Sequence, residues 1–172
     1  GGIMINLFAI ILAVLAAALR LTDHAPNIAA IGALALWSGS YLKSPYKYFL
    51  PVAVMLITDS IIGFYNPAVM AAVYGSYCLG AIIGSYTTKR TAANVALATI
   101  SSSLGFFFIT NFAVWAAGSM YAKNLAGLIQ CFTMALPFFR NTFMSDLLFS
   151  TIFFGVTALA LSKQKNFAYY FQ

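Results

Sequence analysis

Two carboxylates stand out because they fall inside stretches of sequence that otherwise carry almost no charge. Asp59 lies shortly before a turn at Asn66, and Asp146 lies shortly after the expected start of the last apolar stretch. With a rise of ~1.5 Å per helical residue, both carboxylates are expected in one shallow layer at the same end of a helical bundle. Because an ionisable group at membrane depth is costly, each requires a partner, a water-filled cavity or a ligand.

Further polar and aromatic residues are expected at the same height. The segment PFFRNTFMSD, residues 137–146, brings an arginine, an asparagine and an aspartate together. An apolar wall with a few convergent polar groups is typical of a small-molecule pocket, and the sequence predicts one here. The residues expected to bind its ligand are His24, Asn27, Asp59, Tyr74, Tyr77, Asn111, Trp115, Arg140, Asn141 and Asp146.

These residues would have different roles, and each also has a structural alternative. His24 and Asn27 would belong to a lid, the tyrosines and Trp115 would stack on the ligand, and the remaining residues would form the polar end. Alternatively, Arg140 and Asp146 could form an interfacial ion pair. Asn141 could cap a helix, and Asp59 could bond a neighbouring helix.

Enzyme chemistry is not expected. The chain has one histidine and contains no HExxH, GxSxG or glycine-rich phosphate loop. An Asp59–Asp146 dyad could in principle perform acid–base chemistry or intramembrane proteolysis, but neither acid lies in a recognisable catalytic motif. Cys78 and Cys131 form no CxxC or Cys/His cluster, so neither a zinc site nor an intrinsic cofactor is predicted.

Composition indicates that the elements carrying these residues lie in lipid. The chain is 62% hydrophobic and only 7% charged, with a mean hydropathy of +0.89. Such a chain has too little polar surface to cover a soluble domain. The net charge of +6 could suggest a nucleic-acid partner. However, the basic residues are scattered between apolar runs, which favours a role in membrane orientation.

Charges and turn residues predict a six-helix bundle in a single membrane domain, residues 3–162. The expected helices are residues 3–19, 28–42, 48–64, 67–87, 92–117 and 142–162. Gly1 and Gly2 are interpreted as a tag remnant, and residues 163–172 as a cytoplasmic tail. The first helix could alternatively be a signal peptide, although it lacks a basic start. Positive charges after the second, fourth and sixth helices place both termini in the cytoplasm.

The fifth loop, residues 118–141, is expected on the outer side and is itself apolar. Its stretch LAGLIQCFTMALPFF is predicted to form a helix at the interface or folded back over the bundle. Pro137 is expected to turn the chain before Asn141 or Thr142 starts the last helix. Small residues at four-residue spacing, such as Ala13 and Ala17, mark possible close helix contacts within the bundle or with a partner.

Four segments carry a family resemblance: LRLTDHAPNIAAIGALALWSGSYL, LITDSIIGFYNP, TNFAVWAAG and LPFFRNTFMSDLLF. In this order and spacing, across residues 18–150, they resemble a DUF6580-like family of small bacterial membrane proteins described as transport proteins. That family is similar in turn to the substrate-binding S components of energy-coupling-factor vitamin transporters. This likeness implies six helices, an inner-membrane location and a pocket closed by outer loops.

The same resemblance implies partners and a substrate. In S components, small residues of the first helix contact the transmembrane coupling subunit, a role that would fall to Ala13 and Ala17, while an ATPase subunit supplies energy. The solitary cobalamin type implies Cys78 as a cobalt ligand, since thiolates suit soft metals. We therefore expect a receptor that takes up a small nutrient, with cobalamin favoured. The alternative is a non-transporting subunit or assembly factor of a larger membrane complex.

Overall fold

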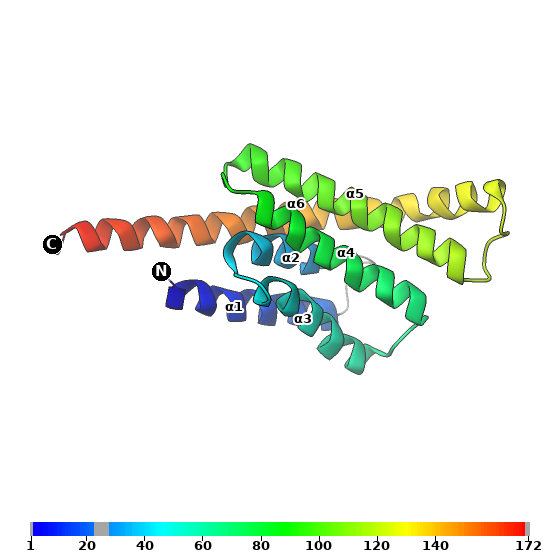
Figure 1. Cartoon of the computed structure of the whole chain (residues 1–172), viewed down its shortest axis with the longest axis horizontal. Helices are drawn as coiled ribbons and strands as arrows, with labels where there is room; N and C mark the ends of the chain where they lie inside the picture. The colour runs from blue at the N-terminus through cyan, green and yellow to red at the C-terminus, as the bar shows by residue number, and fades with distance from the viewer. Residues whose placement is uncertain (1, 23–27, 171–172) are drawn as a thin grey trace.

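The computed structural model describes residues 2–22 and 28–170, with side chains described through Lys163. This part of the chain is all helical, with no strand (Figure 1). Its helices are α1 (Gly2–Leu21), α2 (Ile31–Tyr41), α3 (Tyr46–Ile62), α4 (Pro67–Tyr86), α5 (Ala92–Ala117) and α6 (Leu125–Tyr170). The predicted all-α class is confirmed, and the first five helices lie within a few residues of their expected positions.

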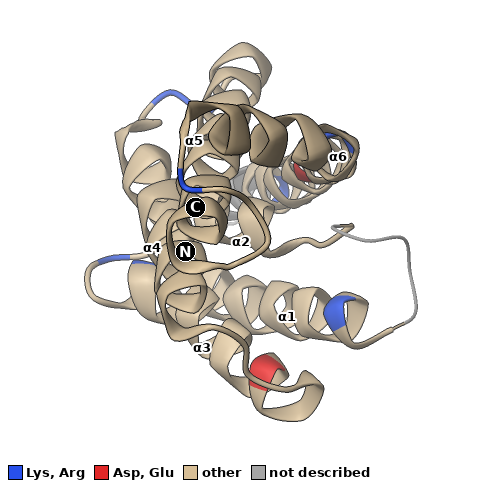
Figure 2. Ribbon diagram, turned by 90° about the vertical axis from the view of Figure 1, so that its right-hand side faces the viewer, with Lys and Arg blue, Asp and Glu red and all other residues tan. Residues whose placement is uncertain are grey.

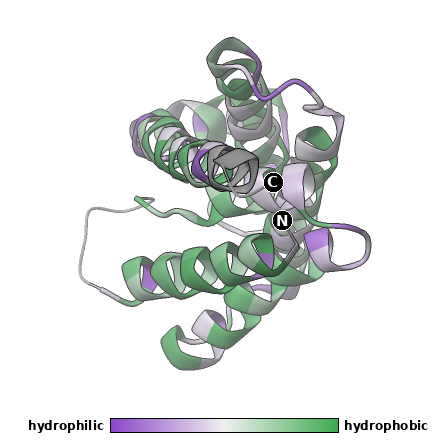
Figure 3. Cartoon of the chain, turned by 90° about the vertical axis from the view of Figure 1, so that its left-hand side faces the viewer, coloured by the Kyte–Doolittle hydropathy of each residue, from purple (hydrophilic) through white to green (hydrophobic). Residues whose placement is uncertain are grey.

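Four helices are long and apolar enough to cross a membrane: α1, α4, α5 and the part of α6 from Leu125 to Lys163. Figure 3 shows hydrophobic residues over most of their length. The other two helices are shorter, because α3 has 17 residues and α2 only 11. At ~1.5 Å per residue, α2 is about 16 Å long, roughly half the thickness of a bilayer core.

The bundle has two distinct ends, which we call the basic end and the cavity end. The start of α1 and the loops after α2 and α4 lie at the basic end, and the C-terminal part of α6 extends beyond them on the same side (Figure 1). Those loops and the adjoining helix starts carry Lys43, Lys47, Lys89 and Arg90. The C-terminus of α1, the N-terminus of α2 and the loop between α3 and α4 lie at the cavity end. Charged residues are otherwise sparse along the ribbons (Figure 2).

Helix α2 forms the centre of the bundle and is held to α4 by close backbone contact. A Cβ atom added at Gly39 would lie 2.0 Å from the Ala81 carbonyl oxygen, and one added at Gly84 would lie 2.1 Å from that of Leu36. The Ser40 hydroxyl also donates to the Gly84 carbonyl at 2.8 Å. These small residues of α2 and α4 therefore lie inside the bundle, where they allow the two backbones to approach.

Helix α6 closes the other side of α2. The Trp37 indole N–H donates to the Thr157 hydroxyl at 2.9 Å, and both side chains are fully buried. At the basic end, the Arg90 guanidinium lies 4.3 Å from the Tyr41 ring centroid and donates to the Ser40 carbonyl. These contacts close the basic end of α2 between α4, α5 and α6.

The expected turn at Pro137 is wrong, because α6 runs without interruption through this residue. Its phenylalanines on either side of the proline pack on one ring of α5: Phe132 and Phe139 lie 5.5 and 4.6 Å from Phe107. The Thr142 hydroxyl donates within the helix, to the Phe138 carbonyl at 3.2 Å, instead of capping a new one. Packing on α5 thus supports the helix where proline removes one backbone hydrogen bond, as membrane helices tolerate.

The stretch expected to lie at the interface or folded back over the bundle therefore forms the first part of α6, antiparallel to the C-terminal half of α5. Residues 107–117 and 125–139 are joined by the loop 118–124, and the tip of this pair extends beyond the ends of α3 and α4 (Figure 1). We call this element the projecting hairpin. Its loop is fastened by the Trp115 indole, which donates to the Ala122 carbonyl at 2.9 Å. Lys123 donates to the carbonyls of Trp115 and Gly118.

Candidate functional site

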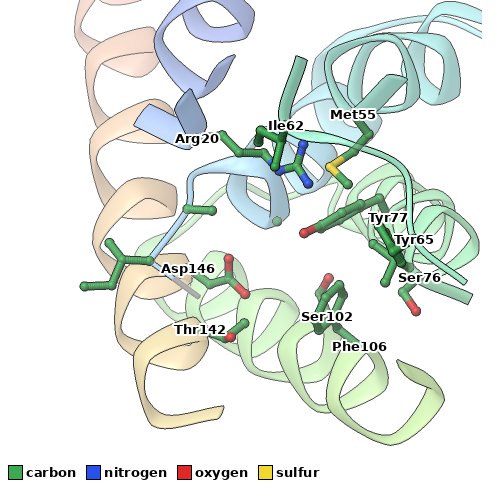
Figure 4. Close-up of a pocket in the computed structure, with 14 residues that line it drawn as sticks. Arg20, Met55, Ile62, Tyr65, Ser76, Tyr77, Ser102, Phe106, Thr142 and Asp146 are labelled. Atoms are coloured by element: carbon green, nitrogen blue, oxygen red, sulfur yellow. The ribbon is translucent and has the colours of Figure 1, made fainter. Parts of the chain in front are cut away.

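A cavity of about 340 Å³ lies at the cavity end of the bundle, and every helix contributes to its wall (Figure 4). Its described lining residues are Arg20, Ile28, Ala29, Gly32, Met55, Ile62, Tyr65, Val73, Ser76, Tyr77, Ser102, Phe106, Thr142 and Asp146. The volume falls at the lower end of the range of about 300–1,000 Å³ that is typical of small-molecule pockets. Of these residues, Arg20 and Asp146 carry charge, and they enter from α1 and α6.

Arg20 is held by a buried network on α3. Its Nη2 atom lies 2.6 Å from Asp59 Oδ1, and its Nη1 atom donates to the Thr58 hydroxyl. The Tyr74 hydroxyl donates to Asp59 Oδ2 at 2.6 Å, so both carboxylate oxygens of Asp59 are satisfied. The Asp59 side chain is only 1% exposed and that of Arg20 19%. The network therefore neutralises the Arg20 charge and fastens the end of α1 to α3 and α4.

Asp146 has a different environment. It is 6% exposed, and its Oδ2 atom accepts a hydrogen bond from the Ser103 hydroxyl at 2.6 Å. No ion pair involves Asp146 among the described residues. The carboxylate lies against the first turn of α2: a Cβ at Gly32 would be 2.3 Å from Asp146 Oδ1. Since the N-cap of α2 is Ala30, without a side-chain cap, the positive end of the helix dipole faces this carboxylate.

Aromatic rings form the apolar side of the cavity. Tyr77 and Phe106 have ring centroids 5.2 Å apart, and Tyr65 joins them from the loop between α3 and α4. Burial raises the pKa of the Tyr65 phenol, and Asp59 raises it further, so this group is neutral at physiological pH. Tyr77 lines the cavity together with Asp146 and Arg20. The cavity thus combines aromatic faces with a carboxylate and an internally paired guanidinium.

A second hollow, of about 380 Å³, adjoins the first along the projecting hairpin. The two share Val73, Phe106 and Thr142. The second hollow is otherwise lined mainly by apolar residues of α4, α5 and α6, together with Thr110 and Asn111. The Asn111 amide donates to the Phe107 carbonyl at 2.8 Å, and the Cys131 thiol donates to the Asn111 carbonyl at 3.4 Å.

Residues 3–168 match the model of a family of unknown function, DUF6580. The chain belongs to this family. Comparisons with curated proteins and with solved structures found no match. The family resemblance expected from the sequence is therefore confirmed for DUF6580, whereas the likeness to S components and to cobalamin receptors gains no support from these comparisons.

In this DUF6580 protein, some of the predicted binding residues meet at the cavity. Tyr77 and Asp146 line it. Asp59 and Tyr74 are connected to it through Arg20, since Arg20 lines the cavity and donates to Asp59, which accepts from Tyr74. Asn111 lines the second hollow instead. His24 and Asn27 lie outside the described residues.

Three other predicted binding residues lie elsewhere on α5 and α6. Trp115 fastens the hairpin loop. Arg140 is exposed, and among the described residues no ion pair joins it to Asp146. Asn141 lies within α6, partly buried, rather than at a helix start. The carboxylates of Asp59 and Asp146 have separate partners, so they do not form a dyad.

The residues predicted for metal and partner contacts are also placed away from the cavity. Cys78 is partly buried on α4 and is not among the described lining residues. No group of three His, Cys, Asp or Glu side chains that could hold a metal ion occurs in the described part of the chain. Ala13 and Ala17 are partly buried against the core of the bundle.

Arg20 and Gly32 are the main site residues that the sequence interpretation missed. Arg20 is not among the binding residues predicted from the sequence, although Asp59 requires a cation at the same height and Arg20 ends the preceding apolar stretch. An arginine at the end of a helix, facing a buried acid on the next long helix, was the available signal. Gly32, between Ile31 and Ala33, gives no sign in the sequence that it makes room for a carboxylate.

Proposed function

We propose that this protein is a membrane receptor or transport protein that binds a small nutrient in the cavity formed by all six helices. The observation that carries the proposal is the cavity itself, where two charged side chains, Arg20 and Asp146, and several aromatic rings converge from elements far apart in sequence. Structural packing alone would favour filling such a space, because helix association in lipid depends on close contact.

The proposed orientation places the cavity end outside and both termini in the cytoplasm. The clustering of Lys43, Lys47, Lys89 and Arg90 at the opposite end supports this orientation through the positive-inside rule. In this arrangement α2 and α3 complete a six-helix membrane domain, with α2 surrounded by the longer helices. The second hollow, which shares wall residues with the first, would be the route by which a ligand enters from outside.

The cavity favours a compound smaller than cobalamin. Its volume of about 340 Å³ leaves no room for a corrinoid ring with its nucleotide tail. Cys78 is not among the described lining residues, which weakens its proposed role as a cobalt ligand. A vitamin-sized or smaller nutrient fits the space, and the energy for uptake would come from a partner or a gradient. Ala13 and Ala17 remain the proposed contact for a coupling subunit, because the other helices bury each side chain only in part.

A cavity-filling substitution on α6 tests the proposal. Thr142 lines both hollows, whereas Thr151 is exposed on the same helix, and each hydroxyl donates to the carbonyl four residues earlier. The measurement is the melting temperature of purified protein in detergent against a panel of vitamins and small nutrients. A ligand at 100 times its Kd stabilises the native state by about 2.7 kcal/mol.

We expect at least one compound to raise the melting temperature of the wild type and of Thr151→Phe, but not of Thr142→Phe. Uptake of that compound into proteoliposomes would then establish transport. If no compound shifts the wild type and a protein partner remains bound through purification, the receptor proposal fails and the structural-subunit alternative replaces it.

A further inference from the structure

The charges of the described side chains around the cavity do not cancel when its acids are ionised. These side chains are one cation, Arg20, and two acids, Asp59 and Asp146, so with both carboxylates ionised they sum to −1. Arg20 and Asp59 neutralise each other at 2.6 Å, and Thr58 and Tyr74 take up further hydrogen bonds of this pair. The remaining charge is the Asp146 carboxylate, in a chain whose overall net charge is +6.

Asp146 is placed to present that charge to a ligand. The Ser103 hydroxyl donates to Oδ2 of Asp146. Ser103 is not among the described lining residues, whereas Asp146 is. Gly32 leaves the room that this position requires, since any larger residue would meet Asp146 Oδ1. In Figure 4 the carboxylate projects from α6 into the space bordered by Arg20, Tyr77 and Phe106.

The opposite wall suits the body of an organic cation. Tyr65, Tyr77 and Phe106 line this wall with aromatic rings, and the faces of such rings attract ammonium groups through their quadrupole. An anionic ligand would need a free cation, but the Arg20 guanidinium is already engaged by Asp59 and Thr58. A bare metal ion is disfavoured because the described residues offer no cluster of three metal-ligating side chains.

On these grounds we propose that the cavity binds a small organic cation, whose ammonium or comparable group pairs with Asp146 while its apolar part rests on the aromatic wall. This inference rests on the proposed function and specifies its substrate class. Asp146 is then the residue that selects ligands by charge, and the Arg20–Asp59 pair is a structural support beside it.

The test uses the full-length protein and three matched probes that share one phenyl ring and a short chain: phenethylamine, phenethyl alcohol and 3-phenylpropionate. Thiamine and choline add further cations to the series, and biotin and pantothenate add further anions. Binding is measured from ligand-dependent melting in the wild type, Asp146→Asn and Ser103→Ala. Asparagine preserves the size of the side chain and its acceptor for Ser103, and Ser103→Ala preserves the carboxylate.

We expect binding only among the cations, with affinity reduced at least tenfold by Asp146→Asn and far less by Ser103→Ala. Binding by neutral or anionic probes that Asp146→Asn leaves unchanged would overturn the inference while leaving a ligand-binding function in place. Absence of binding by every compound in the series, in wild-type protein that melts cooperatively, would count against both the substrate class and the proposed function.

Discussion

Removing the charge of Arg20 should destabilise the protein strongly, because it leaves the Asp59 carboxylate buried without its cation. The Asp59 side chain is 1% exposed and would retain only the Tyr74 hydroxyl, which donates to its other oxygen at 2.6 Å. Breaking a buried pair by removing one partner costs about 3–5 kcal/mol. For a chain of this size, each kcal/mol lowers the melting temperature by roughly 2–4 °C, so Arg20→Met should lower it by about 6–20 °C.

Arg140→Met is the matched control, since it removes the same charge from an exposed residue of α6. Its effect should stay within about 0.5 kcal/mol, as for other surface substitutions. The double variant Arg20→Met with Asp59→Asn removes both charges and keeps an acceptor for Tyr74. It should therefore recover most of the stability lost in Arg20→Met. The pairing argument is refuted if Arg20→Met and Arg140→Met melt at the same temperature, or if the double variant is no more stable than Arg20→Met.

Two further predictions concern close packing around α2. Gly32→Ala should cost about 1–3 kcal/mol through overpacking and displace Asp146, because its Cβ would lie 2.3 Å from Oδ1. Gly75→Ala, with nothing within 4 Å of its Cβ, should match or exceed wild-type stability in the same melting assay. Trp37→Phe loses the hydrogen bond to Thr157 and should cost at least about 1 kcal/mol. Trp115→Phe keeps only the fully buried Trp37, whereas Trp37→Phe keeps only the partly buried Trp115. The fluorescence of Trp115→Phe should therefore be blue-shifted relative to that of Trp37→Phe.

The helices were predictable because hydrophobic runs and turn residues are local signals. Asn66 illustrates this: its side chain accepts hydrogen bonds from the Ala68 and Val69 amides at the start of α4, as an N-cap does. The turn predicted at Pro137 was wrong, because whether a proline ends a helix depends on packing against residues far away in the sequence. Contacts of Phe132 and Phe139 with Phe107 support α6 on both sides of the proline, and no rule of sequence spacing reveals them.

For the site, the sequence indicated which acids need a partner but not which residue pairs with each acid. The sequence indicated that Asp59 and Asp146 each required a partner in one layer, because charges at membrane depth are costly. Which cation reaches which acid depends on the neighbours of each helix end. Arg20 ends α1 beside α3, whereas Arg140 lies on an exposed face of α6. Local sequence spacing does not reveal this choice.

The shortness of α2 also sets the size of the binding space. With 11 residues, α2 begins at Ile31 beneath the cavity, while α4, α5 and α6 continue past it. Where further turns of α2 would have stood, the neighbouring helices enclose an unfilled volume, and Gly32 forms its floor. One additional helical turn would advance α2 by about 5.4 Å, which is enough to fill much of that space. In the proposed receptor, the length of this central helix therefore limits the size of the ligand, so related proteins could change substrate size by gaining or losing a turn there.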